Sequence, residues 1–144
     1  MVVIVCLDDD NGMMFNRRRQ SKDRAVKERI GQLSSGKRLW MNSYTYKLYG
    51  GLCGTEIIEA EDFLERAGSG ELCLVETESL AGVEAKIEKV VLFRWNRKYP
   101  ADFWFDLALS EWKREAVREF SGTSHEKITE EEYCKKGTRY QDEE

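Results

Sequence analysis

Proline, histidine and long apolar runs are scarce in this sequence, and each shortage excludes a class of protein. One proline and eleven glycines among 144 residues leave no low-complexity linker. The apolar runs are only a few residues long, whereas a membrane-spanning helix needs roughly 20 apolar residues. The chain starts directly in a strand-like segment, without the charged and apolar regions of a signal peptide. We therefore expect a cytoplasmic protein that does not enter the membrane.

The single histidine, His125, and the four cysteines form no zinc pattern, because the cysteines are too widely spaced for a CxxC pair. Two of them, Cys6 and Cys73, lie in apolar runs, which indicates small buried side chains in a reducing compartment. A disulfide is the alternative. One histidine also excludes the multi-histidine metal sites of hydrolytic nucleases. We expect no metal site.

What remains is an ordinary globular composition, with 41% hydrophobic and 35% charged residues. A chain of this length buries about two-thirds of its unfolded surface without disulfides or metals. We expect residues 1–144 to form a single domain, with 137–144 as a polar, frayed tail.

Positive charge is concentrated in the first third of the chain, although the net charge is −4. Residues 1–50 carry ten Lys and Arg against five Asp and Glu, and residues 51–144 carry thirteen against twenty-two. The basic segment 17–29 can be a solvated helix face, in which Lys and Arg alternate with acidic residues. It can also attract the phosphates of a nucleotide or of RNA, with Arg17, Arg18 and Arg19 as the contacts.

Apolar patterns predict alternating strands and helices. Residues 2–7 form a continuous apolar run, typical of a strand buried on both faces. A turn at 8–12 follows, whose aspartates cap backbone N–H groups; a magnesium site at Asp8-Asp9-Asp10 is the less favoured alternative. Ser21 is the expected N-cap of a helix with Val26, Ile30 and Leu33 on its buried face, ending at 34–36.

The rest of the chain continues this alternation. Further strands are expected at 38–41, 71–75 and 90–95, and helices after a cap at 42–46, at 61–67 and at 80–87. Beyond Ser110 the patterns conflict. Trp112, Ala116 and Phe120 have helical spacing, whereas a terminal hairpin would place strands on either side of Gly122.

The order of these segments resembles the dihydrofolate reductase superfamily. The matching pieces are the strand and turn VVIVCLDDDNGMMFN, the helix KDRAVKERIGQL and the segment SSGKRLWMNSYTYKLY, where Gly36-Lys37, Met41 and Thr45-Tyr46 keep the family's spacing. The resemblance implies a three-layer α/β/α fold with a mixed, mostly parallel sheet and a C-terminal antiparallel hairpin. It therefore favours strands over a helix for 112–120.

The same resemblance argues against the usual NADPH site. Where the family has a Gly-Gly pair after the central strand, so that backbone N–H groups approach the cofactor pyrophosphate, this chain has Glu76, Thr77 and Glu78. The family's Gly-Arg, whose arginine meets a cofactor phosphate, is Asn42-Ser43 here. The family's carboxylate in the first helix has Asp23 as its nearest candidate for a catalytic residue and Glu28 as the second. Asp23 can instead be a first-turn residue stabilised by the helix dipole.

We therefore expect a dihydrofolate reductase-like scaffold that binds a small molecule or nucleotide without standard reductase activity. Open α/β sheets bind ligands at the carboxyl ends of their strands. The expected lining of this crevice is Asp8, Asn11, Asn16, Asn42, Ser43, Thr45, Glu76 and Thr77. One alternative is a divergent NADPH-dependent reductase. Another is RNA binding or processing through segment 17–29, with Trp40, Tyr44 and Tyr46 as stacking surfaces.

Overall fold

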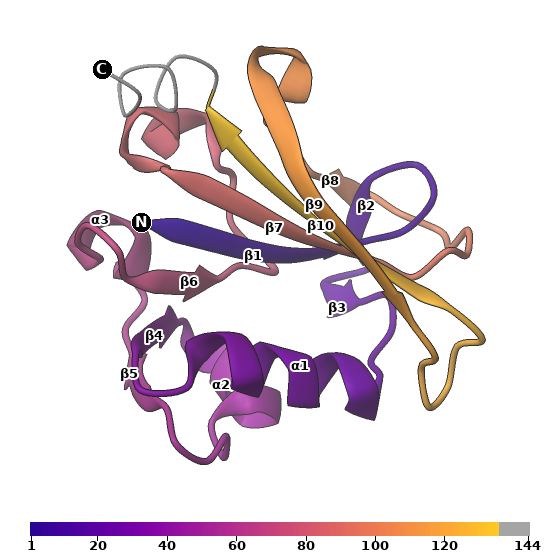
Figure 1. Cartoon of the computed structure of the whole chain (residues 1–144), viewed down its shortest axis with the longest axis horizontal. Helices are drawn as coiled ribbons and strands as arrows, with labels where there is room; N and C mark the ends of the chain where they lie inside the picture. The colour runs from indigo at the N-terminus through magenta and orange to yellow at the C-terminus, as the bar shows by residue number, and fades with distance from the viewer. Residues whose placement is uncertain (136–144) are drawn as a thin grey trace.

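A seven-stranded sheet runs through the molecule in the order β5-β4-β6-β1-β7-β10-β9, in a computed structural model that describes residues 1–135 (Figure 1). The first five strands in this order are parallel, and β10 is antiparallel to both neighbours. The strands are β1 Val2–Leu7, β4 Arg38–Met41, β5 Glu56–Glu59, β6 Leu72–Leu74, β7 Lys89–Arg94, β9 Trp112–Phe120 and β10 Ile128–Lys135. The mixed sheet with a C-terminal hairpin confirms the predicted fold class.

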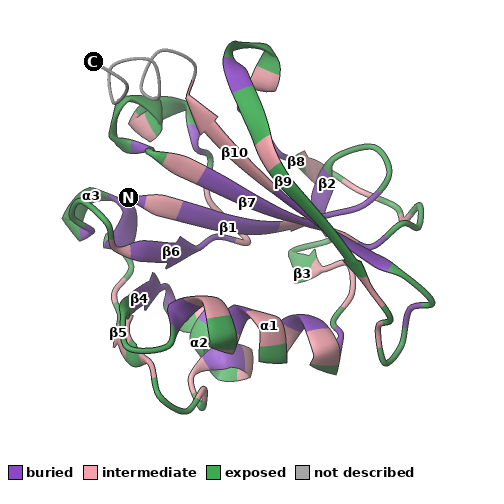
Figure 2. Cartoon of the chain, in the orientation of Figure 1, coloured by how far each residue is buried: buried purple, intermediate pink, exposed green. Residues whose placement is uncertain are grey.

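Helices cover both faces of the sheet because β1 is apolar on both sides. Val3, Val5 and Leu7 pack into one cluster of buried side chains, and Ile4 packs into the other. Helices α1 Arg24–Ser34 and α2 Ser43–Tyr49 contribute to the cluster of Ile4. The short α3 Phe63–Arg66 and the 3₁₀ helix η1 Ala81–Lys86 lie over the other cluster. Figure 2 shows β1, β6 and β7 mostly buried between these layers and β9 largely exposed at the edge.

A second sheet of three short strands includes two strands between β1 and α1, where only a turn was predicted from the sequence. Its order is β3-β2-β8, with β2 Gly12–Phe15, β3 Arg18–Arg19 and β8 Phe103–Trp104. Asn16 and Arg17 form the two-residue turn between β2 and β3, with φ of 52° and 61°. Positive φ at both positions is the conformation that matches the twist of a tight hairpin.

Other predictions are also corrected. Asp23, not Ser21, is the N-cap of α1, because the Asp23 carboxylate accepts from the Ala25 N–H at 2.8 Å. Residues 81–86 form a 3₁₀ helix and not an α-helix, with none of their side chains buried. Strand β5 had no predicted counterpart, because its pattern of two half-buried isoleucines between exposed glutamates is short.

Residues 112–120 form a strand, as the resemblance implied and against their helical spacing. Between Arg114 and Ala116 the pairing of β9 with β10 shifts by one residue. Such a bulge reverses the faces of the side chains that follow. Trp112 therefore packs on one face of the sheet and Phe120 on the other, although their even separation would otherwise place them on the same face.

Within the described part of the chain, no helix combines the length and the apolar character needed to cross a membrane. The predicted tail, 137–144, lies outside the described residues.

Candidate ligand-binding site

Four of the predicted crevice residues meet at the carboxyl ends of β4 and β6. Glu76 accepts hydrogen bonds from Arg19 Nε at 2.8 Å and Nη2 at 2.9 Å, and from the Thr45 hydroxyl at 2.9 Å. Asn42 caps α2 by accepting from the Thr45 N–H at 3.0 Å, and its amide donates to the Thr77 hydroxyl at 2.8 Å. Asn42, Thr45, Glu76 and Thr77 therefore form one polar network with Arg19.

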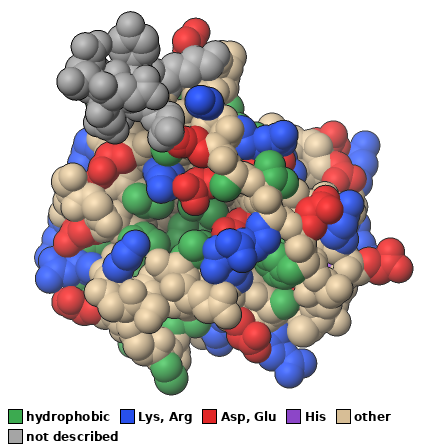
Figure 3. All heavy atoms as spheres, in the orientation of Figure 1, with side chains coloured by type: hydrophobic (Ala, Val, Ile, Leu, Met, Phe, Trp, Pro, Cys, Tyr) green, Lys and Arg blue, Asp and Glu red, His purple; other side chains and the backbone are tan. Residues whose placement is uncertain are grey.

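This network closes the crevice instead of lining an open one. The cavity between Cys6, Trp95 and the Arg19–Glu76 pair measures only about 10 Å³, which is at the limit for a single water molecule. Burial raises the pKa of the Cys6 thiol well above its ordinary value. Figure 3 shows Lys and Arg side chains next to acidic side chains near the middle of this face of the molecule.

The other predicted crevice residues serve the neighbouring turns. Asp8 is buried and accepts from the Asp10 and Gly12 N–H groups at 2.9 and 2.7 Å, as in the expected turn capping. Asn11 takes a positive φ of 64° and accepts from Arg94 at 3.1 Å. Asn16 forms the hairpin turn described above. These residues do not join Glu76 in one site.

Two further backbone amides near the crevice also hold carboxylates of this chain. At the start of α2, the Ser43 N–H donates to Glu61 at 2.8 Å, and the Ser43 hydroxyl donates to the same carboxylate at 3.2 Å. Beside η1, the Leu80 N–H donates to Asp106 at 2.9 Å, and the Ser79 hydroxyl donates to the other oxygen of Asp106. The N–H groups of Ser43 and Leu80 are thus already paired with carboxylates of the chain.

The three consecutive arginines diverge, because side chains on the short β3 strand and its turn point in different directions. Arg17 lines a hollow of about 380 Å³ together with Thr77 and Phe103. Arg18 and Arg19 both line a separate groove, described next, where Arg19 is paired with Glu76. The three predicted phosphate contacts therefore do not line a single hollow.

A cationic groove of about 710 Å³ opens on the flank of the crevice. It contains four basic side chains, two tyrosines, two serines and the single histidine, and none of the residues that line it is acidic. The lining is Arg18, Arg19, Ser21, Lys22, Tyr44, Arg97, Tyr99, Ser124 and His125. Within residues 1–135, the side chains of Arg18, Lys22 and Arg97 form no ion pair. The groove therefore carries uncompensated positive charge.

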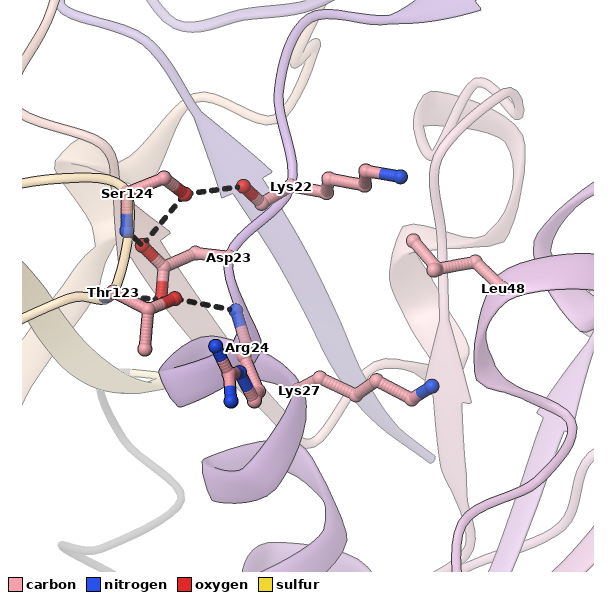
Figure 4. Close-up of a pocket in the computed structure, with 7 residues that line it drawn as sticks. All are labelled: Lys22, Asp23, Arg24, Lys27, Leu48, Thr123 and Ser124. Atoms are coloured by element: carbon pink, nitrogen blue, oxygen red, sulfur yellow. Dashed lines mark hydrogen bonds between the residues drawn. The ribbon is translucent and has the colours of Figure 1, made fainter.

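A smaller hollow of about 400 Å³ adjoins the cationic groove, with Lys22 and Ser124 in the lining of both. Figure 4 shows the Lys22 and Lys27 side chains extending in the same direction, toward Leu48, from the end where Asp23 lies. Arg24 lies on the opposite side of this view. The adjoining hollow thus extends the positive charge toward α2.

His125 lies at the floor of the groove between Asp23 and Ser21. Its Nδ1 is 2.9 Å from Asp23 Oδ2, and its Nε2 is 3.0 Å from both Ser21 Oγ and the Tyr99 hydroxyl. The imidazole stacks on Trp95, with ring centroids 4.8 Å apart. Asp23 and His125 are buried, whereas Ser21 is half-buried.

Asp23 has more partners than any other carboxylate in the groove region. Burial opposes its ionisation, but hydrogen bonds from the Thr123 N–H, His125 and the Ser124 N–H outweigh burial and hold the pKa of Asp23 well below its ordinary value. The predicted catalytic candidate is therefore an ionised helix cap that also holds His125. Its catalytic role stays a prediction.

Sequence reasoning missed His125, Arg97 and Tyr99. His125 is 102 residues from Asp23 along the chain, and its position follows only from the β9–β10 hairpin, whose connection returns to the start of α1. Arg97 and Tyr99 closely precede the chain's only proline, Pro100, a turn signal that could have marked a functional loop.

Among the comparisons with known proteins, no family model and no curated sequence matches this chain. A solved structure of dihydrofolate reductase from Enterococcus faecalis, complexed with NADP(H) and RAB-propyl, is similar over 94% of this chain and 95% of its own. The TM-score is 0.67 and the sequence identity 11%, so the similarity concerns the fold. It confirms the expectation drawn from the order of the segments: the chain has a divergent dihydrofolate reductase-like fold.

Proposed function

We propose that this protein binds a small phosphate-bearing ligand, such as a nucleotide, in the cationic groove. The observation that carries the proposal is the set of Arg18, Lys22 and Arg97, three basic side chains without an ion pair in the described residues around a groove that no acidic residue lines. Its volume of about 710 Å³ lies in the range of small-molecule sites, which is about 300–1,000 Å³.

Charge and shape both favour a phosphate over a neutral ligand. Positive side chains that share a cleft repel one another, and their combined field attracts anions and raises the local anion concentration. Arginine presents a planar fork of donors that matches two phosphate oxygens, which gives Arg18 and Arg97 geometric selectivity as well as attraction. The rings of Tyr44 and Tyr99 provide flat surfaces beside these cations, on which a nucleobase can stack.

The residues at the positions of the family's cofactor phosphates do not fit NADPH. Glu76 follows β6 where the resemblance implies glycines, and it is held by Arg19 and Thr45. A pyrophosphate within a few ångströms of this carboxylate would be repelled, and Glu61 already occupies the N–H group at the start of α2. These contacts disfavour NADPH as the ligand, and a divergent NADPH-dependent reductase stays the alternative.

Binding of single-stranded RNA receives less support from the same surfaces. Trp40 was expected as a stacking surface, but it is buried and donates its indole N–H to Glu71 at 2.9 Å. Tyr46 is exposed, yet it does not line the cationic groove. The cationic groove has a limited volume, and Arg17 lines a different hollow from Arg18. Both features favour a compact ligand.

The test is isothermal titration calorimetry with ATP, AMP, inorganic phosphate, NADPH and a short single-stranded RNA. The paired variant Arg18→Ala/Arg97→Ala removes two groove cations. The matched control Lys37→Ala/Lys113→Ala removes two exposed lysines outside the lining. We expect a nucleotide to bind the wild type and the control alike, and to bind the groove variant at least about tenfold more weakly, since one charged hydrogen bond contributes about 1.5–3 kcal/mol.

Saturable binding of ATP or AMP that weakens with added salt supports the proposal. Equal affinity of the groove variant and the control would place the ligand elsewhere. Binding of RNA alone would show that the ligand class is wrong, and preferential binding of NADPH would restore the reductase alternative.

A further inference from the structure

The structure assigns Ser21, His125 and Asp23 to a nucleophilic triad that hydrolyses a carboxylic ester. The inference rests on the proposed function only for the substrate class, an ester that carries a phosphate group. The triad itself stands on hydrogen-bond geometry that is independent of the basic residues.

The distances have the pattern of an activated serine. Ser21 Oγ is 3.0 Å from His125 Nε2, and His125 Nδ1 is 2.9 Å from Asp23 Oδ2. Both separations lie within the roughly 2.6–3.2 Å over which a base takes a proton from its nucleophile and a third group orients the base. The three residues come from the segment before α1 and from the β9–β10 connection.

Asp23 determines which imidazole nitrogen carries the proton. An ionised carboxylate only accepts hydrogen bonds, so it requires a proton on His125 Nδ1. In the neutral ring Nε2 is then an acceptor that faces Ser21. The Tyr99 hydroxyl lies 3.0 Å from Nε2 and 3.3 Å from Ser21 Oγ. When Tyr99 donates to Ser21 Oγ, the Ser21 proton points at Nε2.

Packing holds this arrangement in place. His125 stacks on Trp95 on one side, and Asp23 accepts from the backbone of Thr123 and Ser124. A Cβ at Gly122 would lie 2.6 Å from Asp23 Oδ2, so the close approach of this loop to Asp23 requires glycine. The base is rigid, while the half-buried Ser21 lies on the groove lining, where a substrate can reach it.

The groove supplies the remaining requirements of ester hydrolysis. Lys22 and Arg97 line it with Ser21, so positive charge is available to the oxygen that becomes negative when a carbonyl is attacked. Arg18 lines the same groove and can hold a phosphate of the substrate. The substrate class is therefore a carboxylic ester of a phosphorylated alcohol or nucleotide.

The reaction needs only water as co-reactant. Ser21 Oγ forms a bond to the carbonyl carbon while its proton passes to His125 Nε2 and the carbonyl electron pair moves to oxygen. As this pair returns, the carbon–oxygen bond to the alcohol breaks and the alcohol takes the proton from Nε2. Water then attacks the acyl-serine, gives a proton to Nε2, and releases the carboxylic acid as Ser21 regains a proton. The sum is ester and water to acid and alcohol.

The experiment uses a neutral fluorophosphonate and p-nitrophenyl acetate on the full chain. We expect mass spectrometry to place one fluorophosphonate adduct on Ser21 of the wild type. Ser21→Ala should give no adduct and should lower ester hydrolysis at least about 100-fold. The control Ser69→Ala replaces an exposed serine outside the groove and should match the wild type. His125→Gln should lose both labelling and ester hydrolysis, because glutamine cannot take the proton from Ser21.

Absence of an adduct on wild-type Ser21, or ester hydrolysis that Ser21→Ala retains, would overturn the triad. A melting curve of Ser21→Ala that matches the wild type shows that loss of activity is not loss of folding. The probes carry no charged phosphate group, so a failure of labelling and a failure of the calorimetric nucleotide titration are separate outcomes, the first for the triad and the second for the proposed function.

Discussion

The Arg19–Glu76 pair should be a major local contributor to stability, and Glu76→Met tests this directly. The substitution keeps an unbranched side chain of similar length but removes three hydrogen bonds, two from Arg19 and one from Thr45. The side chains of Arg19 and Glu76 are only 22% and 13% exposed, so the remaining guanidinium stays largely out of water without a carboxylate partner, although it still lies over the Tyr44 ring. Removing one member of a buried pair costs about 3–5 kcal/mol, and we expect about 2–3 here because Arg19 retains some solvent contact.

Urea unfolding followed by circular dichroism measures this loss. For a domain of this length, about 2–3 kcal/mol also lowers the melting temperature by roughly 5–10 °C. The double variant Arg19→Met/Glu76→Met should recover much of the loss, because two apolar side chains leave no buried charge. The single variant Arg19→Met completes a double-mutant cycle and isolates the energy of the pair.

Two results would refute this account of the crevice. One is a Glu76→Met variant within about 0.5 kcal/mol of the wild type, the size of an ordinary surface substitution. The other is a double variant less stable than Glu76→Met, which would mean that Arg19 is stabilised by something other than Glu76.

Three further predictions concern titration, backbone conformation and thiol reactivity. The pKa of Asp23 is lower in the folded state than its unfolded value of about 3.9, so the unfolded chain binds more protons. The stability that Asp23 contributes is therefore present above about pH 4 and lost below it. In Asp23→Asn, the urea midpoint should fall less steeply as the pH is lowered below about 4. Arg17→Gly should raise the free energy of unfolding by about 0.5–1 kcal/mol in urea titration, because Arg17 holds a φ of 61° that glycine adopts without strain. At about pH 8 a disulfide reagent should label the exposed Cys53 at least about tenfold faster than Cys73, because burial raises the pKa of the Cys73 thiol to about 12. Similar labelling rates of the two thiols in a kinetic assay would contradict the burial of Cys73.

The fold was predictable where apolar patterns are long or buried on both faces. The run at β1 and the spacing of Val26 and Ile30 each have one structural interpretation, and both were confirmed. Strand β9 was ambiguous because its bulge near Glu115 breaks the period on which such patterns depend. Only the family resemblance resolved that segment as a strand.

The site was less predictable, because its residues meet through long-range contacts. Consecutive arginines suggested one phosphate patch, but the tight turn at Asn16 and Arg17 sends successive side chains to different places. The sequence contains one histidine, which excluded a multi-histidine metal site. The number of histidines does not show that Asp23 and Ser21 lie on either side of His125. Pairing with a residue 102 positions away leaves no periodic signal in one sequence.

These contacts favour the proposed cationic groove over the carboxyl ends of the strands as a place for an anion. At the carboxyl ends of the strands, Glu61 and Glu76 already take the donors that an anionic ligand would need. An external phosphate there would have to displace a carboxylate and leave it unpaired beside the ligand. The neighbouring groove presents the opposite situation, since Arg18 and Arg97 have no internal anion among the described residues. A phosphate gains more where no carboxylate of the chain competes, and this argument favours the proposed site beside Ser21 over a site at Glu76.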